Sequence, residues 1–370
     1  MSVSVEDVAQ RAGVSVSTVS RALRGLSGVS ESTRDRVRLI AAELGYTVSP
    51  SASRLASGRT RTVGVVAPLV NRWFFSQVIA GAAAVLREAG YDLLLCDLGD
   101  AEGRKRFFER PSLRGRVDAV IALCLPLAEH EVRALKELDV PVAMVGVQAP
   151  GFGSVCIDDV TSGAMAMRHL LNLGHERVGL LRIGHHGGAN DHFPDDRSRG
   201  YRQALAERGL EVDEHLEAHD RFGVDGGARA MGWLLSGREL PTAVAVECDE
   251  MAFGALRTLR SAGLRVPEDV SVIGFDDQDM AEVFGLTTVR QPVPEQGNQA
   301  ALLVLDALET ADGRSPSQVT MPTELVIRAS TAPPRGTRTG VREQEPGASS
   351  GSLSTTSVVS DPHRRPPVAP

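Results

Sequence analysis

Paired cysteines, long apolar runs and an export signal are all missing from this sequence of 370 residues. Its four cysteines lie far apart and form no CxxC pair, which argues against zinc fingers, redox motifs and a secreted disulfide framework. No apolar run approaches the ~20 residues of a membrane-spanning helix. The first ten residues carry Glu6 and Asp7 and do not have the charged-then-apolar pattern of a signal peptide. We therefore expect a cytoplasmic protein that does not associate with a membrane.

The chain as a whole also lacks the excess of positive charge that is common in nucleic-acid-binding proteins. Its net charge is −7, but residues 1–60 hold eight arginines against five acidic residues. That local balance of +3 leaves −10 for the remainder. A basic head on an acidic body is suited to local phosphate binding, although charged segments are more often simply solvated surface.

Three short helices are predicted within residues 1–46. Each one has a serine that can serve as its N-cap and a glycine close to its end: Ser4, Ser15 and Ser30, then Gly13, Gly25 and Gly45. Apolar residues recur at helical spacing in the first and third helices: Val5, Val8, Ala9 and Ala12, then Val37, Ile40, Ala41 and Leu44. The short link from Gly13 to Ser15 sets the first two helices at a steep angle, as a helix-turn-helix requires.

The rest of the chain divides into a linker, an α/β core and a tail. Residues 47–61 are mostly small or polar and are interpreted as a linker, and residues 332–370 are so rich in Pro, Gly, Ser and Thr that we expect disorder. Between them, β-rich runs alternate with helix-length segments such as 161–173 and 249–261. The runs span 62–68, 91–96, 117–124, 141–147, 177–183, 242–247 and 269–275. This alternation predicts parallel sheets covered by helices on both faces, and about 270 residues suggest two lobes with a cleft between them.

Residues 13–25, GVSVSTVSRALRG, are the most informative stretch. A recognition helix lays its N-terminal residues against base edges in the major groove, which here are Ser15, Val16, Ser17 and Arg21. Val16 falls outside the buried stripe that we assign to Val19, Ala22 and Leu23, so it suits a thymine methyl, while Arg21 suits guanine O6 and N7. Three further residues are placed for phosphate contacts: Thr18, Ser20 and Arg34. On pattern alone, a small helical domain that binds protein is an alternative.

VEDVAQRAGVSVSTVSRAL, VSESTRDRV and LGY closely resemble the head of the LacI/GalR family of bacterial repressors. The resemblance covers roughly residues 3–330 and continues through VGVVAP, REAGYDLLL, LLNLGHERVGLL, RSRGYRQAL, CDEMAFGAL, DVSVIGFDD and TTVRQP. It implies a helix-turn-helix head, a hinge helix and a core like periplasmic sugar-binding proteins. The implied ranges are a head at 1–46, a hinge at 47–61 and a core at 62–331, with lobe 1 at about 62–159 and 291–319 and lobe 2 at about 160–290 and 320–331.

The resemblance also places a hinge wedge in the linker. In the family a leucine of the hinge helix enters the minor groove and kinks the DNA, and Leu55 stands at that position beside Ala52. The sequence departs from the family at two points. Arg24 replaces the usual asparagine before Gly25, which adds a possible phosphate contact, and Ser53 stands where the family usually has arginine or glutamine.

Candidate effector residues follow the predicted strands, at the carboxyl ends where ligands bind in α/β folds. By resemblance, Arg197 of RSRGY and Asp276 of GFDD contact the ligand, and Asp249 matches an aspartate that follows asparagine in the family but Cys248 here. We interpret Asp277 as a helix N-cap. The resemblance implies a sugar-like ligand, and the residue types suit one, because an aspartate can accept from two vicinal hydroxyls and arginine donates a fork.

The first lobe contributes a loop after its first strand. Its candidates are Asn71, Phe74 and Phe75, with Trp73 between them, although core packing is a strong alternative for at least one phenylalanine. Gln291, after TTVRQP, is a further candidate.

The sequence gives little support to other functional classes, such as an enzyme or a metal-binding protein. No GxGxxG follows a strand, and P-loop, GxSxG and HExxH motifs are missing, so we predict neither an enzyme nor a cofactor. The histidines of IGHHGGANDHF and HLEAH do not form a convincing tetrahedral metal site, and we predict no metal. The sequence thus predicts a homodimeric, allosterically controlled repressor of a palindromic operator in double-stranded DNA. The effector's identity and the sign of the response stay open.

Overall fold

The computed structural model describes residues 3–23, 25–46, 59–110, 112–184, 195–310 and 316–335. Three predicted DNA contacts lie outside these residues: Arg24, Ala52 and Leu55. The same holds for most of the expected linker and tail and for the histidines of the 185–194 loop. Among the described helices, none combines the length and the apolarity that crossing a membrane demands.

Three helices form the head: α1 (Val5–Ala12), α2 (Val16–Leu23) and α3 (Glu31–Leu44). The predicted serine caps are present, with the hydroxyl oxygens of Ser4, Ser15 and Ser30 accepting backbone N–H groups at 3.1–3.3 Å. Val8, Val19 and Val37, one from each helix, have no exposed surface and form the centre of the small core. The prediction of three capped helices around one core is confirmed.

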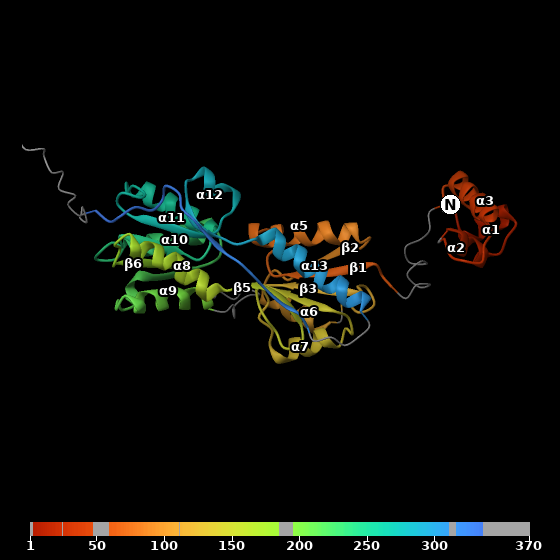
Figure 1. The fold of residues 1–370 in the computed structure, drawn as a ribbon, viewed down its shortest axis with the longest axis horizontal. Helices are drawn as coiled ribbons and strands as arrows, with labels where there is room; N and C mark the ends of the chain where they lie inside the picture. Colours follow the sequence, from red (N-terminus) through yellow and green to blue (C-terminus); the bar gives the residue numbers. More distant parts are fainter. Residues whose placement is uncertain are drawn as a thin grey trace, which may run out of the picture. The chain divides into compact units, whose positions relative to one another are not determined.

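The first sheet of the core has the strand order β11-β5-β4-β3-β1-β2, with every pair parallel. Its strands are β1 (Thr62–Ala67), β2 (Asp92–Asp97), β3 (Ala119–Leu123), β4 (Val142–Val145), β5 (Gly153–Ile157) and β11 (Gln318–Met321). Helices α5 (Trp73–Glu88) and α13 (Val293–Glu309) pack on one face, and α6 (Ala101–Glu109) and α7 (Glu129–Lys136) on the other (Figure 1).

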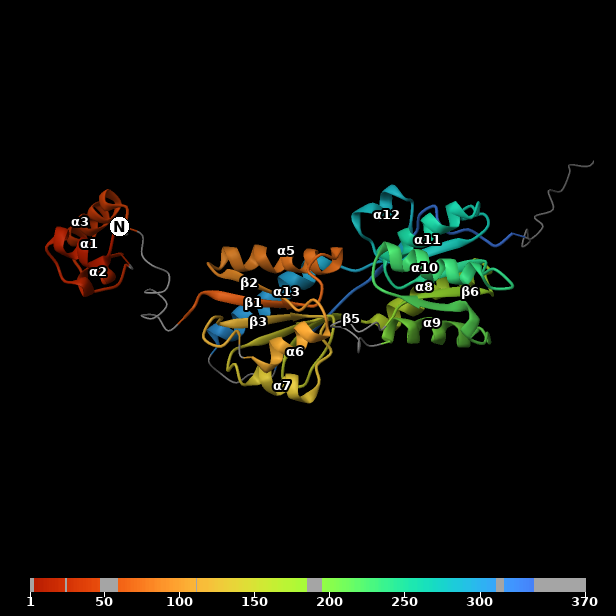
Figure 2. The ribbon, with the colours of Figure 1, turned by 180° about the vertical axis from the view of Figure 1, so that it is seen from behind.

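The second sheet has the order β12-β10-β9-β8-β6-β7, and only the β12–β10 pair is antiparallel. Its strands are β6 (Val178–Ile183), β7 (Glu217–Asp220), β8 (Ala243–Val246), β9 (Ser271–Asp276), β10 (Thr287–Arg290) and β12 (Glu324–Val326). Helices α8 (Asp159–Asn172) and α9 (Asp196–Glu207) cover one face. Helices α10 (Val224–Leu235), α11 (Asp249–Ser261) and α12 (Asp279–Val283) lie on the other (Figure 2).

The chain passes between the two sheets three times: from β5 to α8, from β10 to α13, and from β11 to β12. We call the elements of the first sheet and its helices the first half, and those of the second sheet and its helices the second half. The expected α/β core with two helix-covered, largely parallel sheets is confirmed. The sequence placed the third passage after residue 319, but β11 keeps residues 320 and 321 in the first half, so the chain leaves the first sheet two residues later.

The expected start of the tail needs a correction. The Ala332 carbonyl accepts hydrogen bonds from His175 Nε2 at 2.8 Å and Ser271 Oγ at 3.0 Å, and Arg335 forms an ion pair with Asp269. Residues 332–335 are therefore held to the second half by backbone and charged contacts. The sequence prediction missed these contacts because it considered only how much apolar surface the segment could bury. The tail prediction applies only from residue 336, outside the described residues.

Candidate functional site

The outward face of α2 carries the predicted base-reading side chains. Val16 is 41% exposed, whereas Val19 on the same helix has no exposed surface, so Val16 points away from the core of the head. Ser15, Ser17 and Arg21 are exposed, and Thr18 and Ser20 are half-buried. At the helix N-terminus the Ser15 hydroxyl lies 2.8 Å from the hydroxyls of both Ser17 and Thr18. The surface thus offers hydroxyl groups, one wholly apolar side chain and one guanidinium.

Two arginines of the head differ in what they contact. The Arg21 guanidinium lies beside Gly28, with Nη2 3.6 Å from the position a β-carbon would take, and Gly28 has a φ of +89° that favours glycine. Arg34 Nη2 donates to the Leu26 carbonyl at 3.0 Å. Arg34 therefore holds the loop between α2 and α3, and its phosphate contact stays a prediction.

In the core, Arg197 on the first turn of α9 is the centre of a polar cluster. Its Nη2 and Nε lie 2.7 and 3.1 Å from Asp159 Oδ1, it also donates to the Glu247 carbonyl, and its guanidinium stacks 3.5 Å from the centre of the Phe275 ring. Burial lowers the pKa of Arg197, but Asp159 and Asp276 more than offset it and raise the pKa above its ordinary value. The arginine stays charged and fixed at the end of the second sheet.

Asp276 is the last residue of β9 and is nearly buried, with 5% of its surface exposed. Its Oδ1 accepts a hydrogen bond from Gln291 Nε2 at 2.6 Å, and Gln291 in turn accepts one from Gln296 at 2.8 Å. Burial raises the pKa of Asp276 to about 7, although Arg197 and Gln291 act in the opposite direction. Its φ of 114° is strained for a residue with a side chain, as is common at binding sites. The structure thus brings together three of the predicted ligand residues, Arg197, Asp276 and Gln291.

Asp249 does not fit the predicted role. It has no exposed surface, and its two carboxylate oxygens accept from Thr288 Oγ1 at 2.8 Å and from the Gln278 backbone at 2.9 Å. Burial raises the pKa of Asp249 well above its ordinary range. Its Oδ1 also lies 2.1 Å from where a β-carbon on Gly274 would stand, so only glycine fits there. We assign Asp249 to joining α11, β10 and the loop after β9.

The N-cap interpretation of Asp277 is wrong, because α12 begins after Gln278, one residue later. Asp277 instead accepts from Arg290 and Arg328, each at 2.6 Å, and ties β10 to the segment after β12. Sequence reasoning missed both arginines. Arg328 lies in no motif, and Arg290, although it is part of TTVRQP, meets Asp277 only because strands that are distant in the chain pack together.

The loop after β1 contributes fewer ligand candidates than expected. Phe75 is only 4% exposed and belongs to the first-half core, which corrects its assignment to the ligand. Phe74 meets it edge to face at 5.4 Å and packs against the same core. Asn71 is exposed. Sequence reasoning missed the neighbouring Arg72, whose Nη1 lies 3.2 Å from Glu250 Oε2 in the second half.

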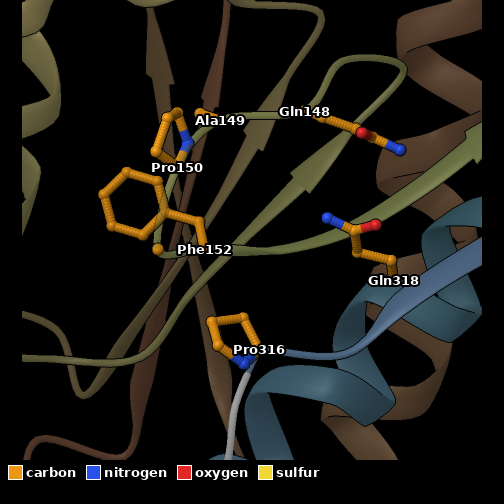
Figure 3. Close-up of a pocket in the computed structure, with 7 residues that line it drawn as sticks. Gln148, Ala149, Pro150, Phe152, Pro316 and Gln318 are labelled. Carbon is orange, nitrogen blue, oxygen red and sulfur yellow. The ribbon is translucent and has the colours of Figure 1, made fainter.

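A surface pocket of about 330 Å³ lies elsewhere, where β5 and β11 begin. It is lined by Gln148, Ala149, Pro150, Gly151, Phe152, Pro316 and Gln318 (Figure 3). None of these lining residues belongs to the cluster of Arg197, Asp276 and Gln291, so the pocket is a separate feature. Within the described residues, no group of three or more His, Cys, Asp or Glu side chains is arranged to hold a metal ion.

The head and the core each match a known family. Residues 4–49 match the family described as bacterial regulatory proteins, lacI family, and residues 167–331 match the periplasmic binding protein-like domain.

Similar proteins match over nearly the whole chain. The HTH-type transcriptional repressor CytR of Escherichia coli (strain K12) is 35% identical over 332 residues, which is 88% of this chain and 96% of that protein. A crystal structure of the lac repressor dimer bound to operator and the anti-inducer ONPF shares 26% identity with a TM-score of 0.79, covering 90% of this chain and 100% of that one. A complex of the transcriptional regulator CelR with cellobiose shares 32% identity with a TM-score of 0.65, covering 89% and 99%.

Proposed function

Because this chain belongs to the LacI family of bacterial regulatory proteins, we propose that it is a sequence-specific transcriptional repressor whose affinity for operator DNA is set by a small ligand. The observation that carries the proposal is the outward face of α2. It presents Val16, Ser17 and Arg21 on a helix whose opposite face is buried, so side chains that suit base contacts stand together on a rigid element. No catalytic role is proposed, and the place of action is the cytoplasm, on nucleoid DNA.

The proposed division of labour follows the elements of the chain. Residues 1–46 read DNA, residues 47–61 act as a hinge, and the core from residue 62 onward binds the effector between its two halves. The core range now extends to residue 335, because residues 332–335 pack on the second half. Ala52 and Leu55 are proposed hinge contacts to the minor groove, and Arg24 a phosphate contact.

A sugar-like effector is proposed for the Arg197–Asp276–Gln291 cluster together with the loop around Asn71. The cluster offers a carboxylate, a guanidinium and an amide whose positions are fixed by Asp159 and Gln296. Such groups match the hydroxyls of a carbohydrate. The complex of CelR with cellobiose, which resembles this chain, is consistent with that class of ligand.

A homodimer on a palindromic operator is proposed because one helix-turn-helix contacts too little DNA for tight specific binding. Two exposed apolar surfaces of the core are suited to pairing. One is on and just after α12, where Met280, Val283 and Phe284 are 44%, 73% and 45% exposed. The other is the edge strand β2, where Leu95 is 42% exposed.

The test is operator binding by the full chain, measured as fluorescence anisotropy on a palindromic site selected from random DNA and on a scrambled site. A panel of monosaccharides and disaccharides, including ribose and cellobiose, is then titrated into the complex. We expect a large preference for the selected site and a shift in affinity with at least one sugar. Equal affinity for both DNAs would contradict DNA reading by α2, and sugar binding without any shift would contradict allosteric control.

A further inference from the structure

Glu250 of the second half contacts the first half through two groups. Its Oε2 lies 3.2 Å from Arg72 Nη1, and its Oε1 accepts a hydrogen bond from the Trp73 backbone N–H at 3.0 Å. Glu250 is the second residue of α11, whereas Arg72 and Trp73 stand where α5 begins. The side chains are largely enclosed, with 14% of Glu250 and 33% of Arg72 exposed. One carboxylate therefore joins two helices that belong to different sheets.

The start of α5 needs this acceptor. Its N-cap residue is Arg72, which makes no side-chain capping hydrogen bond, and the helix opens with the apolar residues Trp73 and Phe74. The first N–H groups of a helix have no partner within the helix and favour a negative charge nearby. Glu250 supplies both an acceptor and a negative charge, so a residue of the second half caps a helix of the first.

The second half is also shaped to receive Arg72. The Arg72 guanidinium stands 5.8 Å from the centre of the Phe222 ring, and its Nη1 is 2.6 Å from where a β-carbon on Gly223 would be. Gly223 has a φ of +111°, so this close approach depends on glycine. Because the Arg72–Glu250 pair is partly enclosed, water and salt screen it less than they screen exposed pairs.

We propose that Glu250 and Arg72 form a clasp that draws the two halves together before any effector binds, and that the strength of this clasp sets the response of operator affinity to the effector. The proposal rests on the function proposed above. The clasp holds the loop that carries Asn71 beside α11, which begins one residue before Glu250 at Asp249, close to the end of β9. An effector bridging the two halves would favour the same approach.

A two-state argument gives the consequence. If the clasp already favours the arrangement in which the two halves are drawn together, effector binding shifts the equilibrium between the two arrangements by less. Operator affinity then differs less between the effector-free and the effector-bound chain. Loosening the clasp should lower effector affinity and enlarge the effector-dependent change in operator affinity. Both effects are expected whichever state binds DNA more tightly.

Trp73 provides a direct probe of the clasp, because the chain has only two tryptophans and the other, Trp233, is 50% exposed on α10. In a Trp233→Phe background of the full chain, we would compare Glu250→Ala, Arg72→Met and the double variant without ligand. Glu207→Gln is the matched control, since it removes one acid of an exposed ion pair in the second half. The readouts are the emission maximum of Trp73 and its quenching by acrylamide.

We expect Glu250→Ala and Arg72→Met each to shift the emission to the red and to increase quenching, with the control unchanged. Adding Arg72→Met to Glu250→Ala should change little more, because one contact is already lost. Unchanged emission and quenching in both single variants, or fully additive effects in the double variant, would overturn the clasp.

Operator binding without effector forms the second arm. We expect Glu250→Ala to change the affinity of the full chain for its selected operator by about fivefold or more, the lower end of typical allosteric coupling, while Glu207→Gln leaves it unchanged. A red shift with unaltered operator affinity would refute the link to DNA binding. If the unsubstituted chain shows no DNA sequence preference, the proposed function fails, while the fluorescence arm still decides whether the clasp exists.

Discussion

Gln291 Nε2 donates to Asp276 Oδ1 at 2.6 Å and joins a passage between the two sheets to the carboxyl end of β9. Gln296 fixes the other side of the Gln291 amide at 2.8 Å. The Asp276 carboxyl group is thus nearly buried, with the neutral Gln291 amide donating to it on one side and the charged Arg197 nearby. Because burial raises the pKa of Asp276 to about 7, the state of this group depends on pH within the physiological range.

Asp276→Asn should reduce the pH dependence of stability. The pKa of Asp276 rises from 3.8 to about 7 on folding, so between these values the folded chain holds a proton that the unfolded chain has lost. The free energy of unfolding therefore falls as pH rises through this window and levels off above about pH 7. The asparagine variant should lose up to one proton's share of that slope, roughly 1.4 kcal/mol per pH unit.

The measurement is urea unfolding at a series of pH values, with Asp225→Asn as control, because Asp225 is 81% exposed and paired with Arg257. Buried Asp249 and Glu247 also have raised pKa values, so some slope should persist. An identical slope in Asp276→Asn and the unsubstituted chain would contradict the assignment of a raised pKa to Asp276.

Arg21→Ala should cost about 1–3 kcal/mol of specific operator binding, the range for a lost bidentate base contact. Binding to a scrambled site should weaken less. Arg38→Ala is a suitable control, since Arg38 is an exposed arginine of the same head and pairs with Asp35 on α3. If Arg21→Ala weakens binding to both sites equally, Arg21 contacts phosphate and our base-reading assignment is wrong.

The sequence predicted elements well where local pattern and burial agree. Helix α11 was expected at 249–261 and has those bounds, and every predicted β-rich run overlaps a strand of the core, although β2 and β9 each extend one residue past the predicted end. Five of the described strands were not among the predicted runs: β5, β7, β10, β11 and β12. Of these, β7, β11 and β12 are edge strands of three or four residues with partial exposure, EAHD, QVTM and ELV, instead of apolar runs. The other two, β5 and β10, are short interior strands, GSVCI and TTVR, in which small or polar residues interrupt the apolar pattern. Short edge strands are specified by their neighbours more than by their own residues.

Site residues were harder to predict, because a motif position does not determine burial. Arg197 and Asp276 are brought together as expected, but Asp249 is turned inward by Thr288 and Gln278, which lie far along the chain. Phe75 follows a loop but points into the core. The Arg72–Glu250 contact joins residues 178 positions apart, a separation that no local signal encodes.

Deleting residues 336–370 should leave folding and operator affinity nearly unchanged, whereas deleting residues 332–370 should lower the melting temperature. The longer deletion removes the Ala332 carbonyl, which accepts hydrogen bonds from His175 and Ser271. It also removes Arg335 and with it the ion pair to Asp269. Buried donors left without acceptors typically cost about 1–3 kcal/mol each. Differential scanning calorimetry of both truncations tests this. Equal melting temperatures would show that residues 332–335 add nothing, and a large loss in the shorter deletion would show that the remaining tail is structural.

The dimer should dissociate when charge is placed on the exposed apolar surface at α12. Val283→Asp is expected to fold, because Val283 is 73% exposed, but to weaken self-association. Leu302→Asp introduces the same charge at an apolar position of α13 that is 42% exposed and serves as control. Sedimentation should show a dimer for the unsubstituted chain at micromolar concentration. A stable monomer or tetramer would contradict the dimer, and an unaffected Val283→Asp dimer would place the interface elsewhere.

The last prediction concerns the coupling between the effector cluster and the hinge. A ligand that bridges Arg197 and Asp276 to the loop around Asn71 should change the angle between the halves. The linker joins the first half, where Asp118 accepts backbone hydrogen bonds from Thr60 and Arg61 at 2.7 and 2.8 Å, so this movement would reach the hinge. A hinge helix too short to be stable alone would form or melt, and Leu55 would enter or leave the minor groove.

Two substitutions should therefore have opposite signatures. Asp276→Ala should abolish the effector response while leaving operator binding by the ligand-free chain intact. Leu55→Ala should weaken operator binding while leaving effector affinity without DNA unchanged. Coupling between two distinct sites must be reciprocal and is typically about 1–3 kcal/mol, or roughly 5–150-fold in operator affinity. Calorimetric titration of the full chain without DNA, beside operator binding with and without effector, measures both sides. If Asp276→Ala still responds to the effector with undiminished affinity, the ligand does not bind at this cluster, and the coupling must begin elsewhere in the core.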